Sequence, residues 1–439
     1  MKEASFEDLF LIEPLRKVLM DEGYDKPTPI QVDTIPHILM GRDIIGCAQT
    51  GTGKTAAFAL PIIQLLHESG KHPKPKRARV LVITPTRELA AQIGESFSTY
   101  GRLLPQSQAV VFGGVKQGRQ VNKMARGVQI LIATPGRLLD LMDQRHIRLD
   151  QVEIFVLDEA DRMLDMGFIR DIKKIIAKLP HQRQSLFFSA TMSKEIIKLA
   201  DTILDDPIKV SVTPESPTVD LIDQKVMFVD RGNKIKLLTK TLTEKDAGKT
   251  LVFTRTKHAA NKVASHLSKA DIPANAIHGN KSQGTRTNTL NRFRSGETPV
   301  LVATDIAARG IDVEDITHVI NYEIPDEPES YVHRIGRTAR AGASGTAISF
   351  CEAPERDNLR NIERFIKRSI NVVDDHPFHS QKAQEATGAD AKRPPKNTGK
   401  RTQNSGRSRK RPQNTGKPKK YPQNRGNHGK RSQGKRKGR

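Results

Sequence analysis

Cysteine is nearly absent from this chain. Its 439 residues include only Cys47 and Cys351, which lie far apart and form no CxxC pair. This argues against both a disulfide framework and a zinc site. Long apolar runs are also missing, because the longest, residues 56–66, contains Pro61 and Gln64 and is about half the length needed to span a bilayer. The first residues lack a basic stretch followed by an apolar one. We therefore expect no signal peptide, no membrane association and a cytoplasmic location.

Acidic residues are missing from one end of the chain. Residues 391–439 hold 19 Lys and Arg but no Asp or Glu, so the net charge of +24 falls to +5 for residues 1–390. From Arg401 a ten-residue pattern without apolar positions recurs, which cannot bury a core. We expect a disordered basic tail over residues 373–439. Its charge predicts sequence-independent binding to polyanions, with Tyr421 as the one Phe, Trp or Tyr among residues 391–439; a solubilising or targeting tail is the alternative.

Two sets of short apolar, β-branched runs alternate with helix-like stretches. The first set comprises residues 79–85, 129–135, 153–161 and 185–191, and the second comprises 249–256, 299–305, 318–324 and 345–350. Such runs are typical of parallel sheets covered on both faces. The chain is also longer than the roughly 250–300 residues that one core supports. We predict an α/β fold with lobes at 1–208 and 219–372, joined by a proline-containing linker at 209–218.

A glycine-rich segment follows the short apolar run at residues 43–47. Its residues are Ala48, Gln49, Thr50, Gly51, Thr52, Gly53, Lys54 and Thr55. Glycines let backbone N–H groups surround phosphate oxygens, and the following helix adds the positive end of its dipole. Lys54 would then reach the β- and γ-phosphates, and Thr55 would bind Mg²⁺. Ala48 stands where such loops usually begin with Gly, and a glycine-rich turn beside an ordinary lysine is the alternative interpretation.

Acidic residues end the apolar run IFVL. Asp158 is placed to supply an oxygen ligand to Mg²⁺, a contact usually made through water. Glu159 could orient and deprotonate the attacking water. Adjacent acidic residues are more often a solvated loop, but these follow a buried strand downstream of a phosphate loop. Together the two segments predict hydrolysis of a nucleoside triphosphate. Upstream, the Gln31 amide could read the edge of adenine and Phe6 could stack on it, although a proline-rich turn before a helix explains them equally well.

Several short strings follow one another along the chain: PTRELA (85–90), GG (113–114), TPGR (134–137), DEAD (158–161), SAT (189–191), VFTRT (252–256), QGTR (283–286), ATDIAARGID (303–312) and HRIGRTAR (333–340). In their order and spacing they resemble the DEAD-box RNA helicases of superfamily 2, most closely the bacterial RhlE-like branch. The resemblance covers about four-fifths of the chain and implies two RecA-like lobes.

The resemblance implies roles for individual residues. Gln31 and Phe6 would select adenine, residues 48–55 would hold the phosphates, and Gly310 and Asp312 would complete the nucleotide site, with Asp312 on the ribose. Arg337 and Arg340 would act as arginine fingers at the γ-phosphate. Ser189, Thr191, Asp161 and His333 would couple hydrolysis to strand separation. RNA would contact Thr86, Arg87, Gly114, Thr134, Gly136, Arg137, Thr254, Arg255, Gln283, Arg286 and Thr304.

One position departs from the family pattern. Ala339 stands where the family usually has Gly, and its methyl group would cost about 0.5–1 kcal/mol if the backbone φ there is positive. Catalysis is not put in doubt, because His333, Arg334, Arg337 and Arg340 are all present.

The resulting prediction is an RNA-dependent ATPase that unwinds short duplexes or removes proteins from RNA, using ATP and Mg²⁺. Ribosomal precursors or RNA-degradation complexes are candidate partners. An ATP-gated RNA clamp or annealing chaperone is the alternative from another class, in which hydrolysis only resets binding. A DNA translocase of the wider superfamily is a third interpretation, disfavoured because the TPGR and SAT strings resemble the RNA branch.

Overall fold

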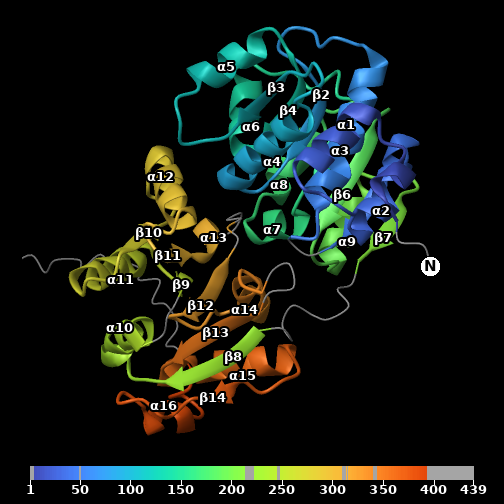
Figure 1. Ribbon diagram of the computed structural model, residues 1–439. Helices are drawn as coiled ribbons and strands as arrows, with labels where there is room; N and C mark the ends of the chain where they lie inside the picture. Colours follow the sequence, from blue (N-terminus) through green and yellow to red (C-terminus); the bar gives the residue numbers. More distant parts are fainter. Residues whose placement is uncertain are drawn as a thin grey trace, which may run out of the picture. The chain divides into compact units, whose positions relative to one another are not determined.

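Two seven-stranded parallel sheets, each flanked by helices, form the computed structural model (Figure 1). It describes residues 4–48, 51–212, 222–244, 248–308, 313, 315–339 and 344–392. The predicted α/β fold with two parallel-sheet lobes is confirmed. The predicted basic repeats from Arg401 onward lie outside the described residues, as do residues 213–221 of the segment between the lobes.

The first lobe has the strand order β3-β4-β2-β5-β6-β1-β7. Its strands are β1 (Ile44–Cys47), β2 (Ala78–Ile83), β3 (Gln108–Val111), β4 (Val128–Ala133), β5 (Ile154–Leu157), β6 (Gln184–Ser189) and β7 (Ile208–Ser211). Its helices are η1 (Phe6–Leu9), α1 (Glu13–Asp21), α2 (Pro29–Leu39), α3 (Lys54–Ser69), α4 (Arg87–Tyr100), α5 (Gly118–Ala125), α6 (Pro135–Asp143), α7 (Ala160–Asp165), α8 (Ile169–Ile176) and α9 (Lys194–Asp201). The edge strand β7 includes residues 209–211, which the sequence assigned to the linker.

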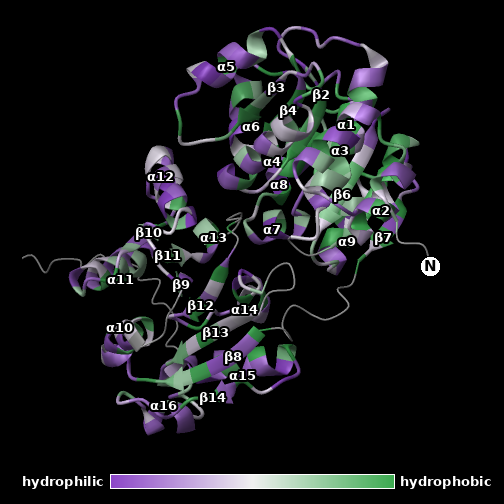
Figure 2. Cartoon of the chain, in the orientation of Figure 1, coloured by the Kyte–Doolittle hydropathy of each residue, from purple (hydrophilic) through white to green (hydrophobic). Residues whose placement is uncertain are grey.

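Successive side chains of the strands of this lobe enter hydrophobic clusters on opposite faces of the sheet. Val80 and Phe188 belong to a cluster with side chains of α1 to α4, whereas Leu81 and Phe187 belong to one with side chains of α6 to α9. In Figure 2 the strands are mainly hydrophobic and the helices carry hydrophilic residues as well. All six residues of β2 are buried, which explains why its sequence is a continuous apolar run.

The second lobe has the strand order β10-β11-β9-β12-β13-β8-β14, so its seven strands repeat the order of the first lobe. Its strands are β8 (Ile222–Phe228), β9 (Lys249–Thr254), β10 (Ala274–Ile277), β11 (Val300–Thr304), β12 (Ile316–Asn321), β13 (Gly345–Cys351) and β14 (Asn371–Val372). Its helices are η2 (Arg231–Asn233), α10 (Lys234–Glu244), α11 (Lys257–Lys269), α12 (Gln283–Arg294), α13 (Asp305–Ala308), α14 (Pro328–Ile335), η3 (Ala353–Glu355), α15 (Arg356–Phe365) and α16 (Gln381–Glu385).

Several helices start just after a strand, and a hydroxyl group caps their first turn. Leu89 N donates to Thr86 Oγ1 over 3.2 Å at the start of α4, and Ala259 N donates to Thr256 Oγ1 over 3.1 Å at the start of α11. Each cap satisfies a backbone N–H group that has no partner within the helix. Because all strands of a sheet are parallel, these strand-to-helix junctions gather at its carboxyl edge, where α/β proteins bind ligands.

Residues 373–392, which the sequence assigned to the tail, pack on the second lobe. Ser380 N donates to Phe228 O over 3.0 Å, and Ser380 Oγ donates to Asp230 Oδ1 over 2.7 Å. Ala383 of α16 and Ala391 are fully buried. The lobe thus includes twenty residues beyond the predicted boundary at 372. None of the helices within the described residues has the length and apolar character required to cross a bilayer.

Candidate active site

The glycine-rich segment lies between β1 and α3 at the carboxyl edge of the first sheet. Gly51 and Gly53 both have φ of +89°, a conformation that favours glycine. A Cβ added to Gly53 would stand 2.5 Å from Gln31 Nε2, so this glycine is also required by close packing. Gln49 and Thr50 lie outside the described residues. The turn therefore has the backbone that the phosphate-loop prediction needs.

Lys54 is the first residue of α3 and is buried. Its Nζ donates to Ala48 O over 2.6 Å, and no carboxylate among the described residues lies within ion-pair distance. A buried ammonium without a bonded counter-ion is costly, and an anion at the same place would offset that cost. The arrangement fits a lysine that receives phosphate.

Asp158 directly follows β5 and is 3% exposed. Its Oδ1 is buried and has no hydrogen-bond partner among the described residues. Burial, followed by repulsion from the Glu159 carboxylate, raises the pKa of Asp158 to about 7. An orphaned carboxylate oxygen beside a phosphate loop fits a ligand to a hard cation such as Mg²⁺.

Glu159 adopts a left-handed backbone with φ of +56° at the start of α7. Both of its carboxylate oxygens accept hydrogen bonds from Arg162 Nη1, over 2.6 and 2.7 Å, and both side chains are buried. Burial acts to raise the pKa of Glu159, but the Arg162 guanidinium outweighs it and the net shift is downward. Sequence reasoning missed Arg162. The i,i+3 spacing from Glu159 was the signal that could have found it.

The predicted adenine-recognition residues are held inside the first lobe. Thr28 N donates to Gln31 Oε1 over 2.9 Å, and Gln31 Nε2 donates to Gly53 O over 3.2 Å, so this amide ties the start of α2 to the phosphate loop. Phe6 is 7% exposed and belongs to the core cluster beneath α2 and α3. The structure brings both residues to this side of the sheet, and their selection of adenine stays a prediction.

Hydrogen bonds join the SAT string to the DEAD string. Ser189 Oγ donates to Thr191 O over 2.7 Å, and Thr191 Oγ1 donates to Asp161 Oδ2 over 3.4 Å. Asp161 also accepts from Arg162 N over 3.0 Å. The structure therefore connects the loop after β6 to the carboxylate segment after β5.

The predicted RNA-contacting residues of the first lobe also gather at the carboxyl edge. Thr86 caps α4 and Thr134 stands at the N-terminus of α6. Gly114 has φ of +81°, which favours glycine, and the Arg87 guanidinium packs directly against it, since an added Cβ would fall 1.9 Å from Arg87 Nη1. Together with neighbouring side chains, Thr86, Arg87, Thr134, Gly136 and Arg137 line a common surface pocket.

The second lobe places its predicted residues on several strand ends and helices. Thr254 ends β9, Thr304 ends β11, and Gln283 and Arg286 lie in the first turn of α12. Thr254 is fully buried, and the Arg255 guanidinium is directed towards Glu355 inside the lobe. Neither side chain is presented openly at the surface, as the predicted RNA contacts would require.

The predicted arginine fingers follow α14. Arg337 is buried, and its Nε donates to the main-chain carbonyl of His333, which lies on α14, over 3.3 Å. Gly310, Asp312 and Arg340 lie outside the described residues. Ala339 has φ of +54°, so its backbone is in the left-handed region in which an alanine is strained, which is the condition for a cost at this position.

Comparisons with known proteins agree with this geometry. Residues 28–199 match the DEAD/DEAH box helicase family model, and residues 233–342 match that of the helicase conserved C-terminal domain. The chain is 43% identical to the RNA helicase CrhR of Synechocystis, over 84% of this chain and 74% of that protein. It is 41% identical to the DEAD-box ATP-dependent RNA helicase CshA of Bacillus subtilis, over 84% and 73% of the two chains.

Solved structures give the same answer. S. cerevisiae Dbp5 bound to RNA and ADP-BeF₃ matches with a TM-score of 0.75 and 30% identity, over 84% of this chain and 95% of that one. Mss116p bound to single-stranded RNA and AMP-PNP matches with a TM-score of 0.75 and 31% identity, over 84% and 80%. These relatives do not single out the RhlE-like branch, which stays a prediction. The chain belongs to the DEAD-box family of ATP-dependent RNA helicases, with two RecA-like lobes.

Proposed function

We propose that this chain couples hydrolysis of ATP, held on the first lobe, to local separation of short RNA duplexes or remodelling of RNA–protein complexes. The observation that carries the proposal is a pair of buried groups at the carboxyl edge of one sheet: among the described residues, the Lys54 ammonium has no ionic partner and an Asp158 oxygen has no hydrogen bond. The first group suits phosphate and the second suits a cation that accompanies phosphate.

Different residues of the first lobe would bind the phosphates, bind Mg²⁺ and activate the attacking water. The backbone of residues 51–53 and the first turn of α3 would hold the phosphates, with Lys54 on the β- and γ-phosphates. Asp158 and the Thr55 hydroxyl would hold Mg²⁺, which neutralises phosphate charge when bound. Glu159 would orient the attacking water and accept its proton, and Arg162 would fix the direction of that carboxylate.

Charge that develops on the γ-phosphate needs further stabilisation. We assign this role to Arg337 and Arg340 of the second lobe, because guanidinium groups suit the spread charge of phosphoryl transfer. An active site completed by residues of both lobes would be active only in a closed arrangement, and a ligand favours closure only by binding it more tightly. ATP and RNA are therefore expected to strengthen each other's binding.

Coupling to RNA would run through the hydrogen bonds of the first lobe. Asp161, Thr191 and Ser189 form one chain of contacts beside the catalytic carboxylates. The predicted RNA contacts of the pocket that contains Thr86 and Arg137 lie on the same edge of the sheet. The basic tail would add charge-driven binding without sequence preference. A cytoplasmic location and association with ribosomal precursors or degradation complexes complete the proposal.

Strand-separation and strand-annealing assays with Glu159→Gln test this function. The variant keeps the shape of the side chain but cannot accept a proton from water. We expect ATP binding to persist and repeated unwinding to fall to the level seen without ATP. Unwinding that continues at the wild-type rate would refute the assigned role of Glu159. Annealing that survives in Glu159→Gln, in the absence of any unwinding by the wild type, would favour the clamp or chaperone alternative.

A further inference from the structure

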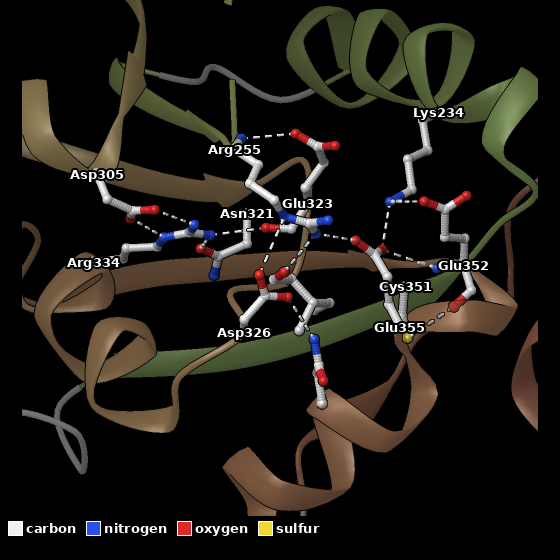
Figure 3. Close-up of polar contacts among 12 residues, drawn as sticks. Lys234, Arg255, Asp305, Asn321, Glu323, Asp326, Arg334, Cys351, Glu352 and Glu355 are labelled. Carbon is white, nitrogen blue, oxygen red and sulfur yellow. Dashed lines mark hydrogen bonds and ion pairs between the residues drawn. The ribbon is translucent and has the colours of Figure 1, made fainter. Parts of the chain in front are cut away.

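A buried ion pair occupies the carboxyl edge of the second sheet. Lys234 begins α10 and is 2% exposed, and Glu355 ends η3 and is fully buried. Lys234 Nζ donates to Glu355 Oε2 over 2.6 Å, and Glu352 lies 3.8 Å from the same ammonium. Glu355 belongs to none of the strings that identify the family. Figure 3 shows its carboxylate reached by Lys234 on one side and by Arg255 on the other.

Arg255 is the second partner of Glu355. Arg255 Nη2 donates to Glu355 Oε1 and to Ile324 O, each over 3.0 Å. Its backbone N donates to Glu323 Oε2 over 2.7 Å, so both the main chain and the guanidinium of this residue are fixed (Figure 3). Arg255 directly follows β9 and Thr254, where RNA contacts are predicted. The orientation of this loop therefore depends on a carboxylate that lies outside it.

The same network continues towards the predicted arginine finger. Arg334 Nη1 donates to Glu323 O over 2.8 Å and to Asn321 Oδ1 over 3.0 Å, and its Nη2 donates to Asp305 Oδ2 over 2.8 Å (Figure 3). Arg334 lies on α14, which Arg337 follows after one residue. Glu323 thus joins the loop of Arg255 to the helix that precedes Arg337.

Burying this many charges contributes little net stability to a lobe, because each charge loses its hydration. Replacing a buried ion pair by apolar side chains of similar volume is often neutral or stabilising, because the charges no longer lose hydration. What apolar side chains cannot do is hold a guanidinium in one orientation. A network that reaches the loop of Arg255 thus points to orientation of that loop as its role.

We propose that Glu355 is a positioning residue for RNA binding, which fixes Arg255 and the loop after β9 through a direct ion pair. The inference deepens the proposed function and depends on it, because it assumes that this loop contacts RNA. Lys234 neutralises the carboxylate from the far side and keeps it pointed at Arg255. Glu355 itself touches neither RNA nor nucleotide.

The test uses the full-length protein and the double variant Lys234→Met/Glu355→Met. Both replacements approximate the volume of the original side chains and remove both charges, so folding should persist, with unfolding in urea as the check. We expect the Michaelis constant for RNA in RNA-stimulated ATP hydrolysis to rise about tenfold, the effect of losing one hydrogen bond to a charged group. The Michaelis constant for ATP and the rate at saturating RNA should stay within about twofold of the wild type.

Two further variants separate orientation from stability. Glu355→Gln keeps the side-chain volume and should also raise the Michaelis constant for RNA. This variant keeps the test decisive if the double variant does not fold. Glu363→Gln is the matched control: this glutamate lies on α15 of the same lobe, accepts from Ile370 N over 3.1 Å and does not contact Arg255. It should leave the Michaelis constant for RNA unchanged.

The outcomes are distinguishable from failure of the proposed function. If RNA does not stimulate the wild-type enzyme, the proposed function fails. If RNA stimulates the wild type and Arg255→Ala weakens RNA binding, but folded variants at Glu355 bind RNA as the wild type does, Glu355 does not position Arg255. A loss of stability with an unchanged Michaelis constant for RNA would likewise overturn the proposal and leave only a structural ion pair.

Discussion

The two lobes have the same strand order, yet the lysine that begins the helix after their first strand meets different partners. In the first lobe, Lys54 starts α3 and bonds to a main-chain carbonyl, that of Ala48. In the second lobe, Lys234 starts α10 and is neutralised by Glu355. Both ammonium groups are buried. One framework therefore holds a cation that is available to an anionic ligand and a cation that is already paired inside the protein.

This difference teaches that the place of a residue in the fold does not set its chemistry. A glycine-rich turn precedes Lys54, whereas η2 precedes Lys234 and η3 supplies a carboxylate. A pocket of about 340 Å³, lined in part by Lys234, Tyr322 and Glu352, lies at the corresponding edge of the second sheet. Because Glu355 already neutralises Lys234, we assign the phosphate-binding lysine to the first lobe alone.

The largest expected difference is between the two lysines. Lys54→Ala should lower the rate of ATP hydrolysis by about 10²–10³-fold, because a cation that stabilises developing charge is removed. Lys234→Met, measured in the same assay at saturating RNA, should change the rate by less than about threefold, since this lysine faces Glu355. Comparable losses in both variants would break the comparison.

A second prediction concerns the buried ion pair of the first lobe, between Glu159 and Arg162. Arg162→Met should lower the free energy of unfolding by about 3–5 kcal/mol, because Glu159 is left buried with its charge unpaired. The double variant Glu159→Gln/Arg162→Met should recover most of this loss, in urea unfolding followed by circular dichroism. Strictly additive losses would show that the pair does not interact.

A third prediction separates the second lobe from the basic tail. Removing residues 393–439 should leave urea unfolding unchanged and flatten the plot of log K for single-stranded RNA against log salt, by about 0.7 for each phosphate that the protein no longer neutralises. Cutting after Asp375 should also destabilise the lobe, by roughly 1–3 kcal/mol, because Ser380 and α16 no longer pack on it. If removing residues 393–439 left the salt slope unchanged, an RNA-binding role for the tail would be refuted.

The smallest expected effect is at Ala339. Its φ of +54° strains an L-residue, so Ala339→Gly should raise the free energy of unfolding by about 0.5–1 kcal/mol. Thermal unfolding measures the change, and Ala264→Gly, in the regular helix α11, is the matched control with the opposite expected sign. Destabilisation in both variants would mean that the backbone at Ala339 is relaxed.

Much of the fold was predictable because parallel strands are buried on both faces. The apolar runs that became β2, β4, β5 and β6 stand out in the sequence for this reason. The short strands β3 and β10 contain polar residues and were not predicted. The packing of residues 373–392 was also missed, since it depends on small alanines and on hydrogen bonds such as that of Ser380, which leave no hydrophobic pattern.

The candidate site was predictable where short motifs fix the chemistry locally. Lys54, Asp158 and Glu159 could be proposed from the sequence because a phosphate loop and a strand-end carboxylate pair need particular residue types in sequence, and their roles stay predictions. Arg162 was missed although its i,i+3 spacing from Glu159 is local. Glu355 was missed for a physical reason: it acts by orienting another residue, and a contact between side chains that the fold brings together leaves no fixed spacing. For Glu355 the partner is one hundred residues away in the chain.

The most direct measurement is the rate of ATP hydrolysis by the full-length protein as RNA is titrated, with DNA of the same sequence as the comparison and Lys54→Ala as the inactive reference. We expect a saturable increase with RNA, little or none with DNA, and loss of both basal and stimulated rates in the variant. A rate indifferent to RNA, or one that survives Lys54→Ala, would contradict an RNA-driven ATPase whose phosphates lie on the first lobe.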